Sequence, residues 1–113
     1  MLNNDGKDPM LTYAELTRWR DNYLHNPESP LLSPLFAELH GLPPLLLLAG
    51  GKDLWLSDSE RDAEKIHQCG GTVDLRVWEN MGHVWVMDSD LAETTSAMVE
   101  IARFVSACQH ATR

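Results

Sequence analysis

The apolar run from Pro43 to Ala49, which ends at Gly50-Gly51, constrains the fold of this chain more than any other feature. A leucine-rich run is compatible with a helix, but this one is short and sharply bounded by prolines and glycines. A continuous apolar segment of this kind indicates a strand that is buried on both faces. Such a strand needs a neighbouring strand along each edge and other elements above and below it.

A second strand is predicted at residues 72–78, where apolar and polar side chains alternate. The residues expected on the buried face are Val73, Leu75 and Val77, and those on the opposite face are Asp74, Arg76 and Trp78. Alternation is typical of a strand with one face in the core and one toward solvent. We therefore expect a half-buried strand near the edge of a sheet.

Helices are predicted at residues 13–24, at 57–69 and from about residue 90 onward. Each begins with the spacing of a capping box, in which two side chains satisfy each other's backbone donors. The pairs are Thr12 with Glu15, Ser57 with Glu60 and Asp90 with Glu93. The expected apolar faces are Leu16, Trp19, Tyr23 and Leu24 in the first helix, Ala63, Ile66 and Cys69 in the second, and Leu91, Thr95, Met98, Ile101, Ala102 and Val105 in the third.

The predicted order of elements is helix, strand, helix, strand, helix, so the fold class is α/β. Two strands joined by a helix are expected to run parallel, with a right-handed crossover. Because two strands make a poor sheet alone, residues 1–113 are interpreted as one partial domain, a flank of a larger sheet. The ends, 1–9 and 107–113, are expected to be flexible.

The charge pattern argues against nucleic acid as a partner. The formal net charge is −8, and the 9 basic residues are scattered, whereas nucleic-acid and anionic membrane surfaces require a basic patch. The N-terminus lacks a basic start followed by an apolar stretch, so no signal peptide is expected. The longest apolar run is too short to span a bilayer.

Neither a metal site nor a cofactor is predicted. Cys69 and Cys108 lack CxxC spacing, and two cysteines do not make a disulfide framework. A reduced, cytoplasmic protein is the simpler interpretation. No Gly-rich phosphate loop follows a strand, which disfavours a small flavodoxin-like binding domain. The histidines without metal-ligand spacing are His25, His40, His67 and His110.

Two titratable residues follow the predicted strands. Asp53 comes after the first strand and His83 after the second, 30 positions later. Because functional groups gather at the carboxyl ends of parallel strands, both side chains are expected at one edge of the sheet. A carboxylate that orients an imidazole lets the histidine act as a general base toward a nucleophile. The plainer alternatives are a solvated turn aspartate and a turn or core histidine.

Residues near this pair have alternative explanations. Asp58 is a second candidate acid, although the helix dipole explains a carboxylate in the first turn of a helix. Trp55 and Trp85 flank the pair. They are consistent with the lining of an acyl pocket or, more simply, with packing.

Four motifs together cover most of the chain. They are Ser33-Pro34-Leu35, Pro43-Pro44 before an apolar strand, an acid five residues before Asp58-Ser59, and Met81-Gly82-His83-Val84-Trp85. The set resembles the C-terminal part of the hormone-sensitive-lipase-like (GDXG) family of α/β-hydrolases, which are esterases and lipases. The resemblance implies that Asp53 is the acid and His83 the base of a triad that hydrolyses a small ester substrate without a cofactor. The chain departs from the family at Leu54, where the acid loop often has proline.

The resemblance also implies that the family's His-Gly-Gly oxyanion segment and G-x-S-x-G nucleophile elbow lie before Met1, because the triad order is serine, acid, histidine. None of the seven serines lies in G-x-S-x-G, and a helix start explains Ser57 and Ser59. We therefore expect a C-terminal hydrolase fragment that is inactive alone and needs a missing N-terminal half or a second copy. The alternative is a non-catalytic flank that binds a partner through its open sheet edge.

Overall fold

Among the residues that the structure describes, helices and strands follow in the predicted order. The structure is a computed structural model, and it describes residues 2–23, 26 and 28–111. The helices are α1 (Tyr13–Tyr23), α2 (Leu56–Gln68) and α3 (Ala92–Ala111), and the strands are β1 (Leu45–Gly50) and β2 (Val73–Trp78). Short 3-10 turns lie at η1 (Leu2–Asn4), η2 (Pro34–Phe36) and η3 (Trp85–Met87).

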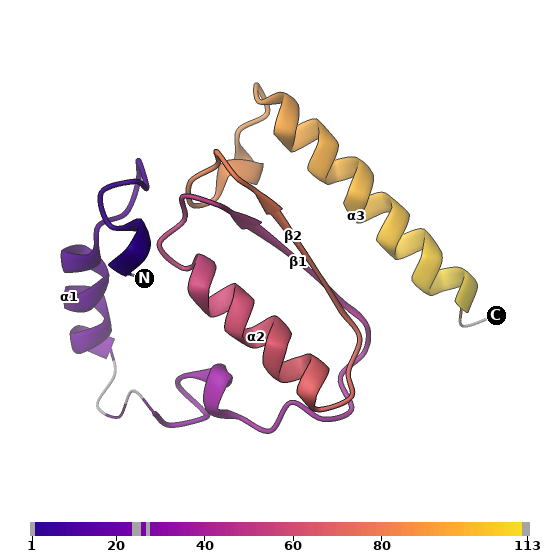
Figure 1. The fold of residues 1–113 in the computed structure, drawn as a ribbon, viewed down its shortest axis with the longest axis horizontal. Coiled ribbons are helices and arrows are strands. Elements are labelled where there is room, and N and C mark those ends of the chain that lie inside the picture. The colour runs from indigo at the N-terminus through magenta and orange to yellow at the C-terminus, as the bar shows by residue number, and fades with distance from the viewer. Residues whose placement is uncertain (1, 24–25, 27, 112–113) are drawn as a thin grey trace.

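The two strands pair in parallel, as the sequence predicts. Their register runs from Leu45 opposite Val73 to Gly50 opposite Trp78. Helix α2 connects the strands and covers one side of the pair, while α3 lies on the other side (Figure 1). Both strands therefore end at the same edge of the sheet.

The core consists of two small clusters. The first packs α2 against the sheet through buried Ala63, Ile66 and Val73, which confirms the inward faces predicted for α2 and for the start of β2. The second joins α1 to the turn after β1, and its buried members are Leu11, Leu16 and Leu54. Apolar contacts thus tie the N-terminal segment to the turn that carries Asp53.

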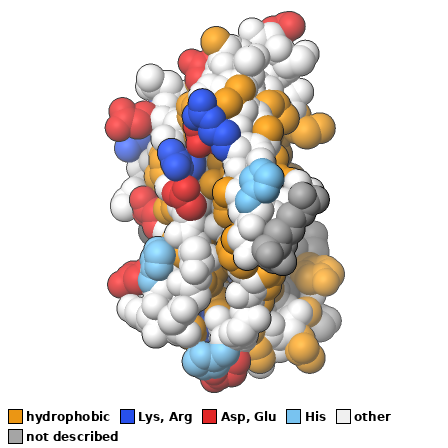
Figure 2. All heavy atoms as spheres, turned by 90° about the vertical axis from the view of Figure 1, so that its right-hand side faces the viewer, with side chains coloured by type: hydrophobic (Ala, Val, Ile, Leu, Met, Phe, Trp, Pro, Cys, Tyr) orange, Lys and Arg blue, Asp and Glu red, His pale blue; other side chains and the backbone are white. Residues whose placement is uncertain are grey.

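The leucines of β1 are only half-buried, although the sequence predicts a strand buried on both faces. In the described part of the chain β1 pairs with β2 alone, so no strand covers its other edge. Figure 2 shows the α3 side of the molecule, where hydrophobic side chains lie at the surface among charged ones. The described residues therefore cover β1 less completely than the sequence predicts.

The capping box predicted for Thr12 and Glu15 is confirmed, and the one predicted for Ser57 and Glu60 is wrong. Thr12 Oγ1 accepts from the Glu15 N–H at 3.3 Å, and Glu15 Oε2 accepts from the Thr12 N–H at 3.3 Å. Helix α2 instead begins at Leu56, after a cap residue whose side chain makes no capping hydrogen bond. The Asp53 turn sets this start, because the Leu56 N–H donates to the Asp53 carbonyl at 3.1 Å.

The apolar face predicted for α1 is only partly buried. Leu16 is buried, whereas Trp19 and Tyr23 are exposed. Leu24 lies outside the described residues. No described segment covers the outer turns of α1.

The apolar face predicted for α3 differs from the one that packs. The helix begins at Ala92 and turns Thr94 and Ala97 into the protein. Met98 and Val105, from the predicted face, are 47% and 48% exposed. Apolar residues recur at helical spacing on both faces of α3, so periodicity alone cannot choose between them.

Both ends take part in structure within the described residues. Asn4 donates hydrogen bonds to the turn after β1, and Asp8 accepts one from it. At the other end, α3 continues to Ala111. Their expected flexibility concerns motion in solution and stays a prediction.

Candidate active site

The turn after β1 carries Asp53 and is fixed by backbone hydrogen bonds. The Asp53 N–H donates to the Gly50 carbonyl at 3.1 Å, which closes a tight turn at the strand end. The Lys52 N–H donates to the Met81 carbonyl at 3.0 Å, which ties this turn to the one after β2. The neighbouring position of the two turns follows from the parallel pairing of the strands that lead into them.

The turn after β2 carries His83. The Met81 N–H donates to the Trp78 carbonyl at 3.1 Å. Val84, the residue after the histidine, has a φ of 49° and lies in the left-handed region. A β-branched residue rarely adopts this conformation, and such strain persists only where the surroundings enforce it. The strained turn leads directly into η3.

Asp53 and His83 meet across the two turns. Asp53 Oδ2 lies 3.0 Å from His83 Nδ1, and the two side chains are 13% and 23% exposed. Because an ionised carboxylate only accepts, this contact favours the tautomer in which Nδ1–H donates to Asp53. The other oxygen, Asp53 Oδ1, accepts from the Trp55 N–H at 2.8 Å. Both oxygens of the Asp53 carboxylate are thus held, one by the imidazole and the other by a backbone N–H group.

The two tryptophans near the pair have different surroundings. The Trp55 ring meets His83 edge-on, with ring centroids 4.7 Å apart and planes at 85°. Trp85 is buried and lies against Trp78, with centroids 4.8 Å apart. Trp55 therefore contacts the imidazole directly, whereas Trp85 packs against Trp78.

Glycines permit the close approach of the two turns. A Cβ on Gly50 would lie 2.3 Å from the Met81 carbonyl oxygen, and one on Gly82 would lie 2.6 Å from Pro9 Cδ. Real Cβ atoms essentially never approach another heavy atom this closely. The sequence motif that contains Gly82 and His83 thus has a steric reason as well as a chemical one.

A groove of about 440 Å³ opens beside His83. Its apolar wall comes from the histidine turn, η3 and the N-terminal segment. The residues of that wall include Pro9, Met10, Met81, Val84, Met87 and Leu91. The groove offers an apolar surface next to an imidazole. Of the two tryptophans that the sequence offers as pocket lining or packing, Trp85 lines this groove.

The rival acid, Asp58, lies elsewhere. It is in the first turn of α2, where its Oδ1 is 3.8 Å from Arg61 Nη1. Burial, and then the charge of Asp58, raises the pKa of Asp62. The structure thus brings Asp53, rather than Asp58, to the histidine.

Two contributors to the site were missed by sequence reasoning. Asn4 and Asp8 bond to the backbone of the Asp53 turn from 46 or more positions away. Asp8-Pro9 looks like an ordinary turn, and no local pattern indicates its distant partner.

Two other kinds of feature are absent from the described residues. No group of three or more histidine, cysteine, aspartate or glutamate side chains in the described ranges is arranged to hold a metal ion. No helix in that part of the chain is long and apolar enough to cross a membrane.

Residues 1–87 match a family model described as the alpha/beta hydrolase fold. Among curated proteins, an esterase from Acinetobacter venetianus is 33% identical over 107 residues, covering 91% of this chain and 35% of that protein. An acetyl-hydrolase from Streptomyces hygroscopicus is 33% identical over 81 residues, covering 70% of this chain and 27% of that protein. The chain thus spans about a third of the length of these relatives.

Solved structures agree. The hormone-sensitive-lipase homologue EstE7 from a metagenome library superposes with a TM-score of 0.88 at 30% identity, covering 94% of this chain and 38% of that chain. An esterase from the bacterial hormone-sensitive lipase family gives 0.85 at 36% identity, covering 90% and 35%. The chain belongs to the α/β-hydrolase family, and within it to the hormone-sensitive-lipase-like group of esterases and lipases.

Proposed function

We propose that this chain supplies the acid and the base of a serine-hydrolase triad that cleaves small carboxylic esters. The observation that carries the proposal is the 3.0 Å contact between Asp53 Oδ2 and His83 Nδ1 at the carboxyl edge of a parallel strand pair. The esterases and acetyl-hydrolase to which the chain is similar support an ester as substrate.

In this proposal His83 acts through Nε2. With Nδ1–H donating to Asp53, Nε2 is left unprotonated and can take the proton of a serine hydroxyl as that oxygen attacks the ester carbonyl. The resulting imidazolium then gives the proton to the leaving alcohol. Water repeats the cycle on the acyl-enzyme, and Asp53 stabilises the charged imidazole at each step.

We further propose that the 113-residue chain is inactive by itself. Its seven serines include none in a G-x-S-x-G elbow, and an activated serine needs both a base and oxyanion donors in fixed geometry. The nucleophile and oxyanion groups would come from an N-terminal hydrolase segment.

Purified chain assayed with a short-chain p-nitrophenyl ester tests this second statement. We expect a rate no higher than that of the His83→Ala variant, because the imidazole has no nucleophile to activate. A clear rate that His83→Ala abolishes would show that the chain carries its own nucleophile, contrary to the proposal.

A second candidate function is that of a non-catalytic partner-binding module. It is favoured by the outer edge of β1, which pairs with no strand among the described residues. The unpaired N–H and C=O groups of such an edge are a template for a strand of another chain. The partner would be a hydrolase-type N-terminal half or a second copy of this chain.

Solution behaviour tests the module. We expect self-association or aggregation of the isolated chain, relieved by co-expression with an N-terminal hydrolase fragment. A monomer with a sharp, cooperative thermal transition would contradict it, because such a molecule needs no partner at its edge.

We also propose a reducing, cytoplasmic setting. The support is that Cys69 and Cys108 are too few, and too far apart in the sequence, to make a disulfide framework. Isolation of the native protein under conditions that trap thiols, with a disulfide found at either cysteine, would contradict this placement.

A further inference from the structure

We propose that Asp8, assisted by Asn4, is a positioning residue that holds the Asp53 turn in register with the His83 turn. The inference rests on the function proposed for Asp53 and His83. It gives Asp8 no contact with substrate; Asp8 acts through the backbone that carries the acid.

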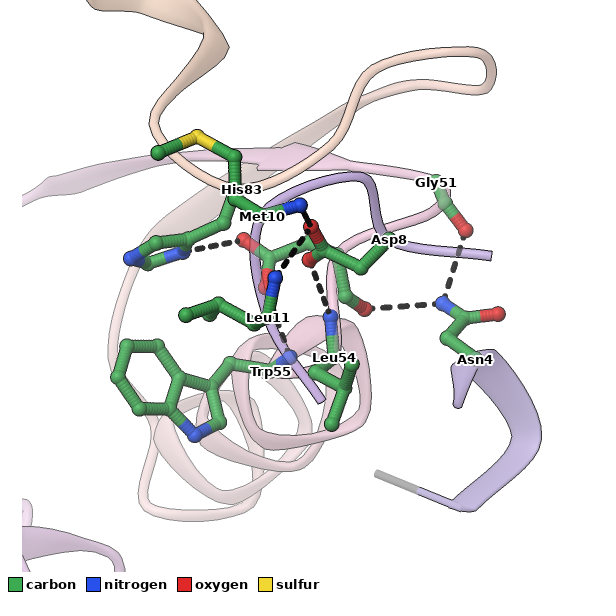
Figure 3. Close-up of polar contacts among 9 residues, drawn as sticks. Asn4, Asp8, Met10, Leu11, Gly51, Leu54, Trp55 and His83 are labelled. Atoms are coloured by element: carbon green, nitrogen blue, oxygen red, sulfur yellow. Dashed lines mark hydrogen bonds and ion pairs between the residues drawn. The ribbon is translucent and has the colours of Figure 1, made fainter. Parts of the chain in front are cut away.

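Asp8 joins two segments that are distant in sequence. Its side chain is buried, at 8% exposure. Oδ1 accepts from the N–H groups of Met10 and Leu11 at 2.9 and 3.3 Å, and Oδ2 accepts from the Leu54 N–H at 3.1 Å. Figure 3 shows this carboxylate between the N-terminal segment and the acid turn. A buried carboxylate is costly unless hydrogen bonds satisfy it, and here three backbone donors do so.

The hydrogen bond from the Leu54 N–H fixes the backbone next to the acid. The next N–H along the chain, that of Trp55, donates to Asp53 Oδ1 at 2.8 Å. Consecutive backbone N–H groups therefore bind two different carboxylates. Asp8 fixes the peptide on one side of this pair, and Asp53 is anchored to the other, so a shift of the Leu54 peptide would move the acid relative to the imidazole.

The same N-terminal segment also contacts the histidine turn. A Cβ on Gly82 would lie 2.6 Å from Pro9 Cδ and 3.3 Å from Asp8 Oδ1. On the acid side, the Asn4 amide donates at 2.9 Å to both the Gly51 and the Asp53 carbonyl oxygens. One short segment thus touches both turns that hold the pair.

The decisive variant is Asp8→Asn. The side chain keeps its size and one oxygen for Met10 and Leu11, but it presents an amide N–H₂ to the Leu54 N–H, where an acceptor is needed. Asp5→Asn is the matched control, because Asp5 lies in the same segment and accepts from the Tyr13 N–H at 3.0 Å, on the exposed surface. The control changes the charge by the same amount without touching either turn.

Two NMR readouts of the whole chain report the effect. One is solvent exchange of the His83 Nδ1 proton, and the other is amide hydrogen exchange at Leu54 and Trp55. We expect Asp8→Asn to raise exchange about tenfold or more at these three sites while the amides of α3 keep their protection, and Asp5→Asn to leave all of them unchanged. Equal loss of protection throughout the chain, or no change at the three sites, would overturn the proposal.

Asn4→Ala covers the case in which Asp8→Asn does not fold. It removes the two bonds to the acid turn and leaves Asp8 in place, so a rise in exchange of roughly threefold at the His83 Nδ1 proton is expected. No rise would overturn the assisting role of Asn4 and, if Asp8→Asn is unfolded, the positioning role as a whole. If the native chain itself lacks a protected His83 Nδ1 proton, the proposed Asp53–His83 contact is wrong. The positioning role of Asp8 is then still tested by the Leu54 amide, which donates to Asp8.

Discussion

The edge of the sheet that carries Asp53 and His83 is closely packed, whereas the side that faces α3 is loosely covered. At the edge, Leu54 is 0% exposed and glycines let backbones meet. On the α3 side, Leu46 is only half-buried, and Met98 and Val105 of the helix are 47% and 48% exposed. The contrast shows that contacts within this chain can set the geometry of the pair, while the described residues leave part of the sheet uncovered.

The largest expected effect is on the packed edge. Leu54→Ala should lower the free energy of unfolding by about 3 kcal/mol, because it leaves a cavity under the acid turn. Urea denaturation measures the change. Leu31→Ala is the control, since Leu31 is 92% exposed and should cost less than about 0.5 kcal/mol. Equal effects at the two leucines would remove the distinction between the two regions.

A smaller loss is expected from Gly50→Ala. Its Cβ would meet the Met81 carbonyl oxygen at 2.3 Å, and overpacking against backbone costs about 2 kcal/mol. Gly70→Ala separates this clash from conformational strain, because Gly70 has a φ of 79° and open space around it. The control should cost about 1 kcal/mol. A Gly50→Ala protein as stable as the native chain would show that the two turns are free to separate.

On the loosely covered side, substitution should be nearly neutral for the isolated chain. Met98→Gln on α3 should change stability by less than about 0.5 kcal/mol, because the side chain is already half exposed. Sedimentation should at the same time show weaker self-association, since the apolar surface is reduced. A loss above about 2 kcal/mol would mean that α3 packs on this face after all.

The smallest effect concerns pH. Burial and the charge of Asp58 raise the pKa of Asp62, so the folded chain binds this proton more tightly than the unfolded chain. The stabilisation is fully present below the ordinary pKa of aspartate and is lost as pH rises through the raised value. Asp62→Asn should therefore raise the melting temperature slightly at pH 7. At pH 3, melting curves of the two proteins should nearly coincide; a larger gain at pH 3 than at pH 7 would contradict this sign.

Local patterns in the sequence predict much of the fold. The bounded leucine run, the alternation at 72–78 and the helical spacing between them were enough for the order of elements and the parallel pairing. The meeting of Asp53 and His83 follows from that topology, although their roles stay predictions. The sequence was less informative about helix α3, where either face is apolar enough to pack.

Long-range polar contacts could not be predicted. Asp8 and Leu54 are 46 positions apart, and nothing in Asp8-Pro9 distinguishes a buried acceptor from a solvated turn. The start of α2 was misjudged for a related reason. Ser57 and Glu60 have capping spacing, but the turn closed by Asp53 starts the helix earlier.

The most direct test of the central claim is reconstitution of an esterase. The chain is mixed or co-expressed with a nucleophile-bearing N-terminal fragment of a hormone-sensitive-lipase-like esterase, and hydrolysis of a short-chain p-nitrophenyl ester is measured. We expect activity only when both pieces are present, with a loss of at least about a thousandfold for His83→Ala and for Asp53→Asn. Reconstituted activity that survives His83→Ala unchanged would contradict the assignment of this pair as the base and acid of the triad.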